Sequence, residues 1–107
     1  MEFQKLVERA IGIREQYAAH EKPLYGSPWS GEEIALGFVG DVGDLAKLIV
    51  AESGKRNIAK SKEKLAHELS DCLWSVIALS YIHEIDLERS FVNTMNELAQ
   101  HLAEYPS

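Results

Sequence analysis

The sequence predicts an all-α domain, and three observations support that fold class. Apolar residues recur at spacings of three and four, the period of an amphipathic helix, over most of the chain. Glycine and proline gather where such segments would end. The chain has 107 residues, enough for one modest core, and shows no repeat or low-complexity tract. We therefore expect a single four-helix, bundle-like domain over residues 1–107.

The first helix is predicted over residues 2–19, which place an apolar stripe between charged positions. It should end before "HEKPLYGSPWSG", residues 20–31, because two prolines and two glycines disfavour regular structure there. Ser30 is predicted as the N-cap of the second helix, with two glutamates in the first turn. Gly54 is a natural stop for that helix.

The third helix should begin at Ser61 as its N-cap and continue with a broad apolar face. The last helix is predicted to start near Asp86 and to end at Pro106. The second and third helices are apolar over more than one stripe, which is typical of helices with neighbours on several sides. Four helices from a short chain cover such surfaces incompletely, so we expect a homodimer or homotetramer.

Charge and composition exclude several classes of protein. The net charge of −6 and the pI near 5.1 argue against binding to a nucleic acid polymer. Cys72 is the only cysteine, so an intrachain disulfide is excluded. The first residues lack the order of a secretion signal, and no apolar run approaches the roughly 20 residues that span a membrane. We expect a cytoplasmic protein without a membrane partner.

Two apolar helical segments each contain a pair of acidic residues three positions apart. "GFVGDVGDLAKLI" contains Asp41 and Asp44, and "AHELSDCLWSVIALS" contains Glu68 and Asp71. Residues at this spacing share one helix face, where like charges destabilise the helix unless a positive partner lies between them. That partner is either a nearby lysine or a divalent cation such as Mg²⁺, which prefers carboxylate oxygens.

The string "DVGDLAKL" followed by "HELSDCLW" resembles the MazG-like nucleotide pyrophosphohydrolases, whose signature is E-x-x-E, a loop and E-x-x-D. "EIDLERSF" is similar to the usual opening of that family's last helix, so the resemblance runs from about Glu33 to Leu98. It implies an all-α fold, oligomerisation, Mg²⁺ dependence with Mn²⁺ as a substitute, and hydrolysis of nucleoside triphosphates to monophosphate and pyrophosphate. By position, it implies four residues that are both metal ligands and catalytic residues: Asp41, Asp44, Glu68 and Asp71.

Four further residues are candidates for substrate binding. Lys55 and Arg56 belong to the basic loop "GKRNIAKSKEK", which would hold the outer phosphates or simply be solvated. Trp29 lies in the loop before the second helix, where it would stack on a base or cover the end of the bundle. Asn93 lies close to the position of a polar residue in the resembled family.

The departures from the family pattern keep other functions open. The first motif has Asp at both acidic positions where the family usually has Glu, and Gly40 stands where relatives often have another Glu. Our leading hypothesis is a Mg²⁺-dependent pyrophosphohydrolase that removes non-canonical nucleotides. The alternatives are an enzyme similar to phosphoribosyl-ATP pyrophosphohydrolase and a non-catalytic helical module that binds a nucleotide or a protein.

Overall fold

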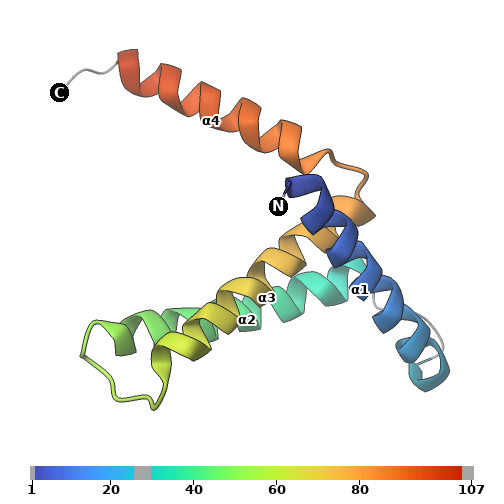
Figure 1. Cartoon of the computed structure of the whole chain (residues 1–107), viewed down its shortest axis with the longest axis horizontal. Helices are drawn as coiled ribbons and strands as arrows, with labels where there is room; N and C mark the ends of the chain where they lie inside the picture. Colours follow the sequence, from blue (N-terminus) through green and yellow to red (C-terminus); the bar gives the residue numbers. More distant parts are fainter. Residues whose placement is uncertain (1, 26–29, 105–107) are drawn as a thin grey trace.

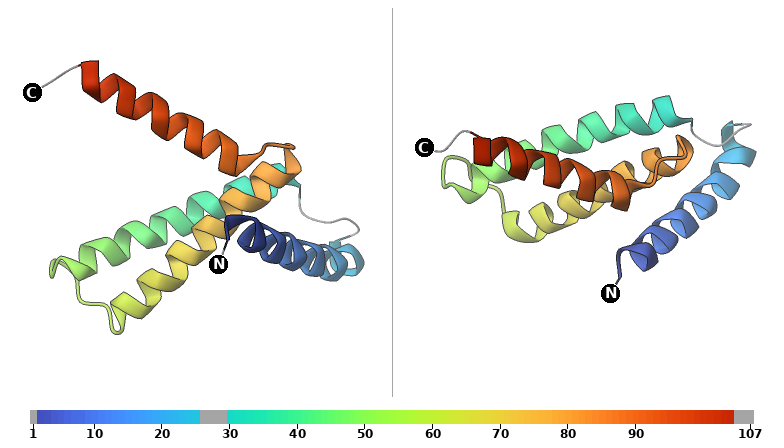
Figure 2. Two further views of the ribbon diagram at one scale, coloured as in Figure 1. Left: turned by 45° about the horizontal axis from the view of Figure 1, so that its top comes forward. Right: turned by 90° about the horizontal axis from the view of Figure 1, so that it is seen from above.

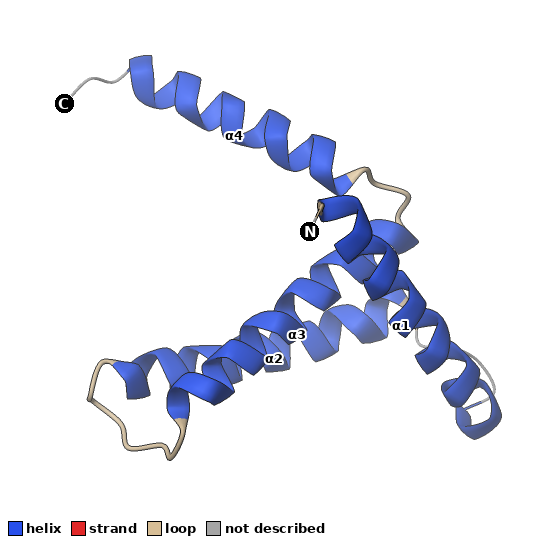
Figure 3. Ribbon diagram, in the orientation of Figure 1, coloured by secondary structure: helices blue, strands red, loops and turns tan. Residues whose placement is uncertain are grey.

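The structure is a computed structural model that describes residues 2–25 and 30–104. Within these ranges the chain forms four α-helices and no strand (Figure 3): α1 (Phe3–Tyr25), α2 (Gly31–Glu52), α3 (Ser61–Ile82) and α4 (Leu87–Glu104). The predicted all-α class is confirmed. Among the described helices, none combines the length and the apolar character needed to cross a membrane.

The centre of the fold is the pair formed by α2 and α3, which lie side by side and run in opposite directions (Figure 1). Both helices contribute buried side chains to the core: Ile34 and Leu48 from α2, and Ile77 and Ala78 from α3. Ile34 and Leu48 lie on one face of α2, about four turns apart, and this face meets α3 along the pair. The core is small, and this pair is its main support.

Helix α1 packs across α3, at the end of the pair opposite the loop that joins α2 to α3 (Figures 1 and 2). The indole Nε1 of Trp74 donates a hydrogen bond of 3.2 Å to the carbonyl oxygen of Ala10, which is buried. The ring of Tyr17 meets the same indole edge to face, with centroids 5.8 Å apart. A hydrogen bond and an aromatic contact therefore hold α1 on α3.

The predicted end of the first helix is wrong, because α1 continues to Tyr25 and passes through Pro23. A proline removes a backbone donor and opposes a helix, but the turn after residue 19 is stabilised by burial and by a contact within α1. Glu21 is buried in that turn, and its Oε1 lies 3.9 Å from Nη1 of Arg14, two turns earlier on α1. This packing outweighs the local signal for a break.

The N-cap of α2 is the predicted one. The hydroxyl of Ser30 accepts a hydrogen bond from the amide of Glu33, and the Glu33 carboxylate accepts one from the amide of Ser30. This capping box fixes the start of α2. The helix ends at Glu52, and Gly54 follows with a φ of +83°, a conformation that favours glycine.

The predicted N-cap of the third helix is wrong by one residue. Ser61 occupies the first helical position, and Lys60 is the N-cap, with a left-handed backbone and no capping side chain. The carbonyl of Lys60 accepts the first helical bond, from the amide of Lys64, at 3.1 Å. The chain enters α3 through this left-handed residue, which moves the serine inside the helix. The last helix starts near Asp86 as predicted, and the Oδ1 of Asp86 accepts a hydrogen bond from the amide of Arg89.

Helix α4 extends away from the other three helices, as the orange-to-red ribbon in Figure 1 shows. The Cα radius of gyration is 17.2 Å, whereas a compact domain of this length is expected to have about 13 Å. An apolar stripe along α4 is exposed: Phe91, Met95, Leu98 and Leu102. The face of α2 that points away from α3 is also apolar and exposed: Leu36, Val39 and Val50. Two apolar surfaces of this chain are therefore uncovered.

Candidate metal centre

Three of the four predicted acids meet between α2 and α3. Asp41, Asp44 and Glu68 each offer a carboxylate oxygen, and these oxygens lie within 4.8 Å of one another. The first two residues share a face of α2 because they are three positions apart, and the antiparallel pairing brings that face to the first half of α3. The sequence spacing and the helix pairing together place three negative charges in one small volume.

Burial and mutual repulsion both act on these carboxyl groups. The pKa of Asp41 is raised, mainly by burial and then by the charges of Asp71 and Asp44, while His67 opposes the shift. The pKa of Glu68 is raised by burial first, and then by the same three aspartates. The carboxyl groups of Asp41 and Glu68 are therefore harder to ionise here than in water, which is the electrostatic condition that a bound cation relieves.

One oxygen of the cluster is distinguished by the lack of a hydrogen-bond partner within residues 2–25 and 30–104. The Oε2 atom of Glu68 is buried and accepts no hydrogen bond from the part of the chain that the structure describes. No ion pair joins a lysine or arginine of residues 2–25 and 30–104 to the three clustered acids. The prediction that nearby lysines neutralise the acidic pairs is therefore not observed in the described residues. A buried carboxylate oxygen without a hydrogen-bond partner lowers the stability of the folded protein.

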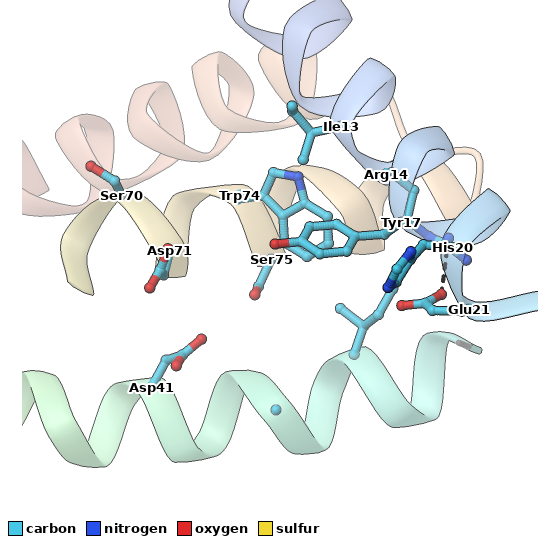
Figure 4. Close-up of a pocket in the computed structure, with 12 residues that line it drawn as sticks. Ile13, Arg14, Tyr17, His20, Glu21, Asp41, Ser70, Asp71, Trp74 and Ser75 are labelled. Carbon is cyan, nitrogen blue, oxygen red and sulfur yellow. Dashed lines mark ion pairs between the residues drawn. The ribbon is translucent and has the colours of Figure 1, made fainter. Parts of the chain in front are cut away.

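The fourth predicted ligand, Asp71, lies next to this group but outside it. Its Oδ2 is 3.2 Å from Nε2 of His67, one turn earlier on α3. Figure 4 shows Asp71 on α3 facing Asp41 on α2. Its negative charge acts on both Asp41 and Glu68, as their raised pKa values show. Asp71 is therefore close enough to influence the cluster electrostatically, while one of its oxygens is engaged elsewhere.

The structure does not bring the predicted substrate-binding residues to the acids within one chain. Lys55 and Arg56 are exposed in the loop after α2, and α2 ends about 12 Å beyond Asp44 at the usual rise per residue. Asn93 is exposed on α4, on the face opposite the apolar stripe. The prediction for Trp29 lies outside the described residues.

A cavity of about 560 Å³ opens beside the acids, and the sequence analysis does not predict it. Asp41 and Asp71 line one end, and residues of α1, α2 and α3 form the remaining walls (Figure 4). Arg14 and Glu21 both line it, and their spacing of seven residues places them on one face of α1. The spacing of Arg14 and Glu21 is the sequence signal for this wall of the cavity. The predicted helix end at residue 19 leaves Glu21 outside the helix, so the sequence analysis does not use that signal.

The donor set suits a hard cation. All three clustered ligands are carboxylates, which Mg²⁺ and Mn²⁺ prefer over thiols and thioethers. Burial raises the pKa of the nearby Cys72 thiol, and the charges of Asp41 and Glu68 raise it further, so the thiol stays protonated and is a poor ligand.

Comparison of the chain with protein-family models, curated proteins and solved structures found no match. The site itself is therefore the basis of the functional proposal.

Proposed function

We propose that this protein is a Mg²⁺-dependent nucleotide pyrophosphohydrolase that converts nucleoside triphosphates to monophosphate and pyrophosphate. One observation supports this most: Asp41, Asp44 and Glu68 converge from two helices, and a buried oxygen of Glu68 has no hydrogen-bond partner in the described part of the chain. Carboxylates projecting from facing helices are an established way to hold divalent cations in helical proteins. The resemblance of both acidic motifs to MazG-like pyrophosphohydrolases points to the same chemistry. Such an enzyme would remove non-canonical nucleotides in the cytoplasm.

Each acid has a role that follows from its surroundings. Asp41, Asp44 and Glu68 would hold the cation, which supplies positive charge for the phosphate oxygens and acidifies water. Asp71 lies outside that group with its Oδ2 beside His67, so its other oxygen would act as the general base. The attacking water would give its proton to Asp71 and its oxygen to the α-phosphorus. The bond from that phosphorus to the bridging oxygen would break, and pyrophosphate would leave.

The experiment is to assay pyrophosphate release from a panel of nucleoside triphosphates, with and without Mg²⁺. We expect release only with the metal, and a loss of about 100-fold or more in Asp71→Asn, the range of a missing general base. Glu97→Gln, an exposed acid on α4, is the matched control and should retain full activity. Turnover without divalent metal, or full activity in Asp71→Asn, would contradict the proposal. Thermal stabilisation by nucleotides without turnover would favour a binding module instead.

We also propose that two copies of this chain form a homodimer through the α4 stripe and the outer face of α2. Both surfaces are apolar and exposed in one chain, and α4 has little contact with its own core. A helix with such a stripe is stable in water only when the stripe is covered, since most helical stability comes from packing of the apolar face. A second copy offers matching surfaces, because α4 of each chain would meet α2 of the other.

A further inference from the structure

A buried serine hydroxyl faces the cavity beside the acids. Ser75 is 4% exposed, and it lines this cavity of about 560 Å³. Figure 4 shows its oxygen directed toward α2, on the side of the cavity where the acids lie. No hydrogen bond joins this hydroxyl to any group of residues 2–25 and 30–104. Because a buried hydroxyl normally has a hydrogen-bond partner, a ligand in the cavity is the natural source of one.

The other serines of α3 show that the helix itself does not prevent such a bond. The Ser70 hydroxyl donates to the carbonyl oxygen of Ala66 at 2.9 Å. The Ser80 hydroxyl donates to the carbonyl oxygen of Ile77 at 2.7 Å. Helical serines often satisfy their hydroxyls in this way. Ser75 is the most deeply buried of the three and does not, so both its donor and its acceptor positions are open to a ligand.

The α2 side of the cavity leaves room for that ligand. Gly37 lines the cavity from α2, and a Cβ added there would meet no atom within 4 Å. Arg14 and Glu21 lie at the end away from the acids, and both are engaged in contacts within the protein, so they act as a wall. The volume of the cavity is within the usual range for small-molecule sites.

The groups that line the cavity follow a fixed order. Asp71 and Asp41 lie at one end, and Ser75 shares a face of α3 with Asp71 because it is four residues later. The rings of Trp74 and Tyr17, which meet edge to face, lie on the α1 side of this serine. Acids that bind a cation, then a hydroxyl, then aromatic rings match the order of phosphate, sugar and base in a nucleotide.

We propose that this cavity binds the nucleoside part of the substrate and that the Ser75 hydroxyl forms a hydrogen bond with a hydroxyl group of the sugar. The inference rests on the proposed function for the class of ligand, but nucleoside binding requires neither metal nor hydrolysis. A sugar that lacks the bonded hydroxyl would leave Ser75 buried without a partner. That loss is the physical basis for discrimination between a sugar and its deoxy form.

The test measures binding of uncharged nucleosides to the full chain without metal, by NMR titration of the Trp74 indole N–H signal. Adenosine, guanosine, cytidine and uridine are compared first, and the tightest is then compared with its 2′-deoxy and 3′-deoxy forms. We expect one deoxy form to bind about fivefold more weakly, the effect of about one hydrogen bond. In Ser75→Ala all three forms should bind within about twofold of one another. Ser80→Ala, whose hydroxyl serves the Ile77 carbonyl outside this cavity, should retain the preference.

Gly37→Leu tests the cavity itself. The new side chain would occupy open space in the cavity, and leucine favours a helix more than glycine does, so the variant should fold. We expect it to bind the nucleoside about tenfold more weakly or worse, with a Tm no lower than that of the parent. Gly12→Leu on α1 also adds a side chain in open space but does not line the cavity, so it is the matched control and should bind normally.

Four results would overturn the inference: no nucleoside binding, equal binding of the nucleoside and both deoxy forms, a preference that survives Ser75→Ala, and unchanged binding in Gly37→Leu. The hydrolysis assay separates this inference from the proposed function. Metal-dependent turnover together with any of these four results would remove only this inference. Nucleoside binding that depends on Ser75, without turnover of any triphosphate, would remove only the enzymatic function.

Discussion

The Nε2 atom of His67 lies 3.2 Å from Oδ2 of Asp71, one turn apart on the exposed edge of α3. This contact draws one oxygen of Asp71 toward a side chain of its own helix. Asp41, Asp44 and Glu68 have no such contact with a basic side chain in the described part of the chain. The four acids look equivalent in the sequence, but the structure separates them. Asp41, Asp44 and Glu68 form one group, and Asp71 lies beside it.

This division predicts unequal effects on metal binding. Asp44→Asn should weaken Mg²⁺ binding about tenfold or more, because it removes one of three converging carboxylates. Asp71→Asn should weaken it less, through the loss of a nearby negative charge alone. Calorimetric titration of both variants with Mg²⁺ tests the order. A larger loss of affinity in Asp71→Asn would show that Asp71 is a ligand and that the division is wrong.

Glu68→Gln should stabilise the metal-free protein while removing its response to Mg²⁺. The substitution removes a partly buried charge whose Oε2 has no hydrogen-bond partner among the described residues and which is repelled by Asp41. We expect the free energy of unfolding to rise by about 1 kcal/mol, or the Tm by about 5 °C. Thermal unfolding with and without Mg²⁺ measures both effects, with Glu97→Gln as the exposed control. A lower Tm in metal-free Glu68→Gln would contradict this prediction.

The raised pKa values predict how stability depends on pH. Above the ordinary values of 3.8 for Asp41 and 4.5 for Glu68, the folded protein holds protons that the unfolded chain has lost. The free energy of unfolding without metal should therefore fall as pH rises through this range. Saturating Mg²⁺ should reverse the slope, because the cation binds the ionised carboxylates. Urea unfolding at several pH values tests this, and Glu68→Gln should show a smaller dependence. A metal-free stability that rises across the same range would be the opposite result.

Trp74→Phe should loosen the contact between α1 and α3. The ring contact with Tyr17 would be retained, but the hydrogen bond from Nε1 to the Ala10 carbonyl oxygen would be lost. That oxygen would then lack its side-chain donor at a buried position. We expect a loss of about 1 kcal/mol in the free energy of unfolding. Urea unfolding followed by circular dichroism gives the value. Tyr17→Phe, which keeps the ring and changes only the hydroxyl, should have a smaller effect, and equal effects would count against this bond.

Leu98→Glu should convert the proposed dimer to a monomer. The residue lies in the middle of the α4 stripe and is 51% exposed in the single chain. A charge buried at the contact should cost about 3 kcal/mol, more than a hundredfold in the dissociation constant. Sedimentation equilibrium of both proteins measures this constant. Gln100→Glu adds the same charge on the polar face and should leave the dimer intact, while a dimeric Leu98→Glu would place the contact elsewhere.

Local signals in the sequence predicted the helices well, and tertiary contacts account for the differences. Ser30 acts as the expected cap because its capping box is complete within four residues. The end of α1 was missed because Glu21 is held by Arg14 and by burial, which outweigh the proline two residues later. Spacing brought Asp41 and Asp44 to one face, but only the pairing of α2 with α3 determines which acids converge. The cavity depends on the crossing of α1, which no local pattern specifies.

The glycines of α2 have a consequence for how the acid-bearing helix moves. Gly40 and Gly43 flank Asp41, and an added Cβ at either position would meet nothing within 4 Å. Each glycine weakens the helix by about 1 kcal/mol relative to alanine, and no close packing at these positions offsets that loss. The amide hydrogens around Asp41 should therefore exchange with solvent faster than those elsewhere in the interior of α2. A ligand that bridges Asp41 and Glu68 would slow this exchange, because it would link the glycine-containing turn of α2 to α3.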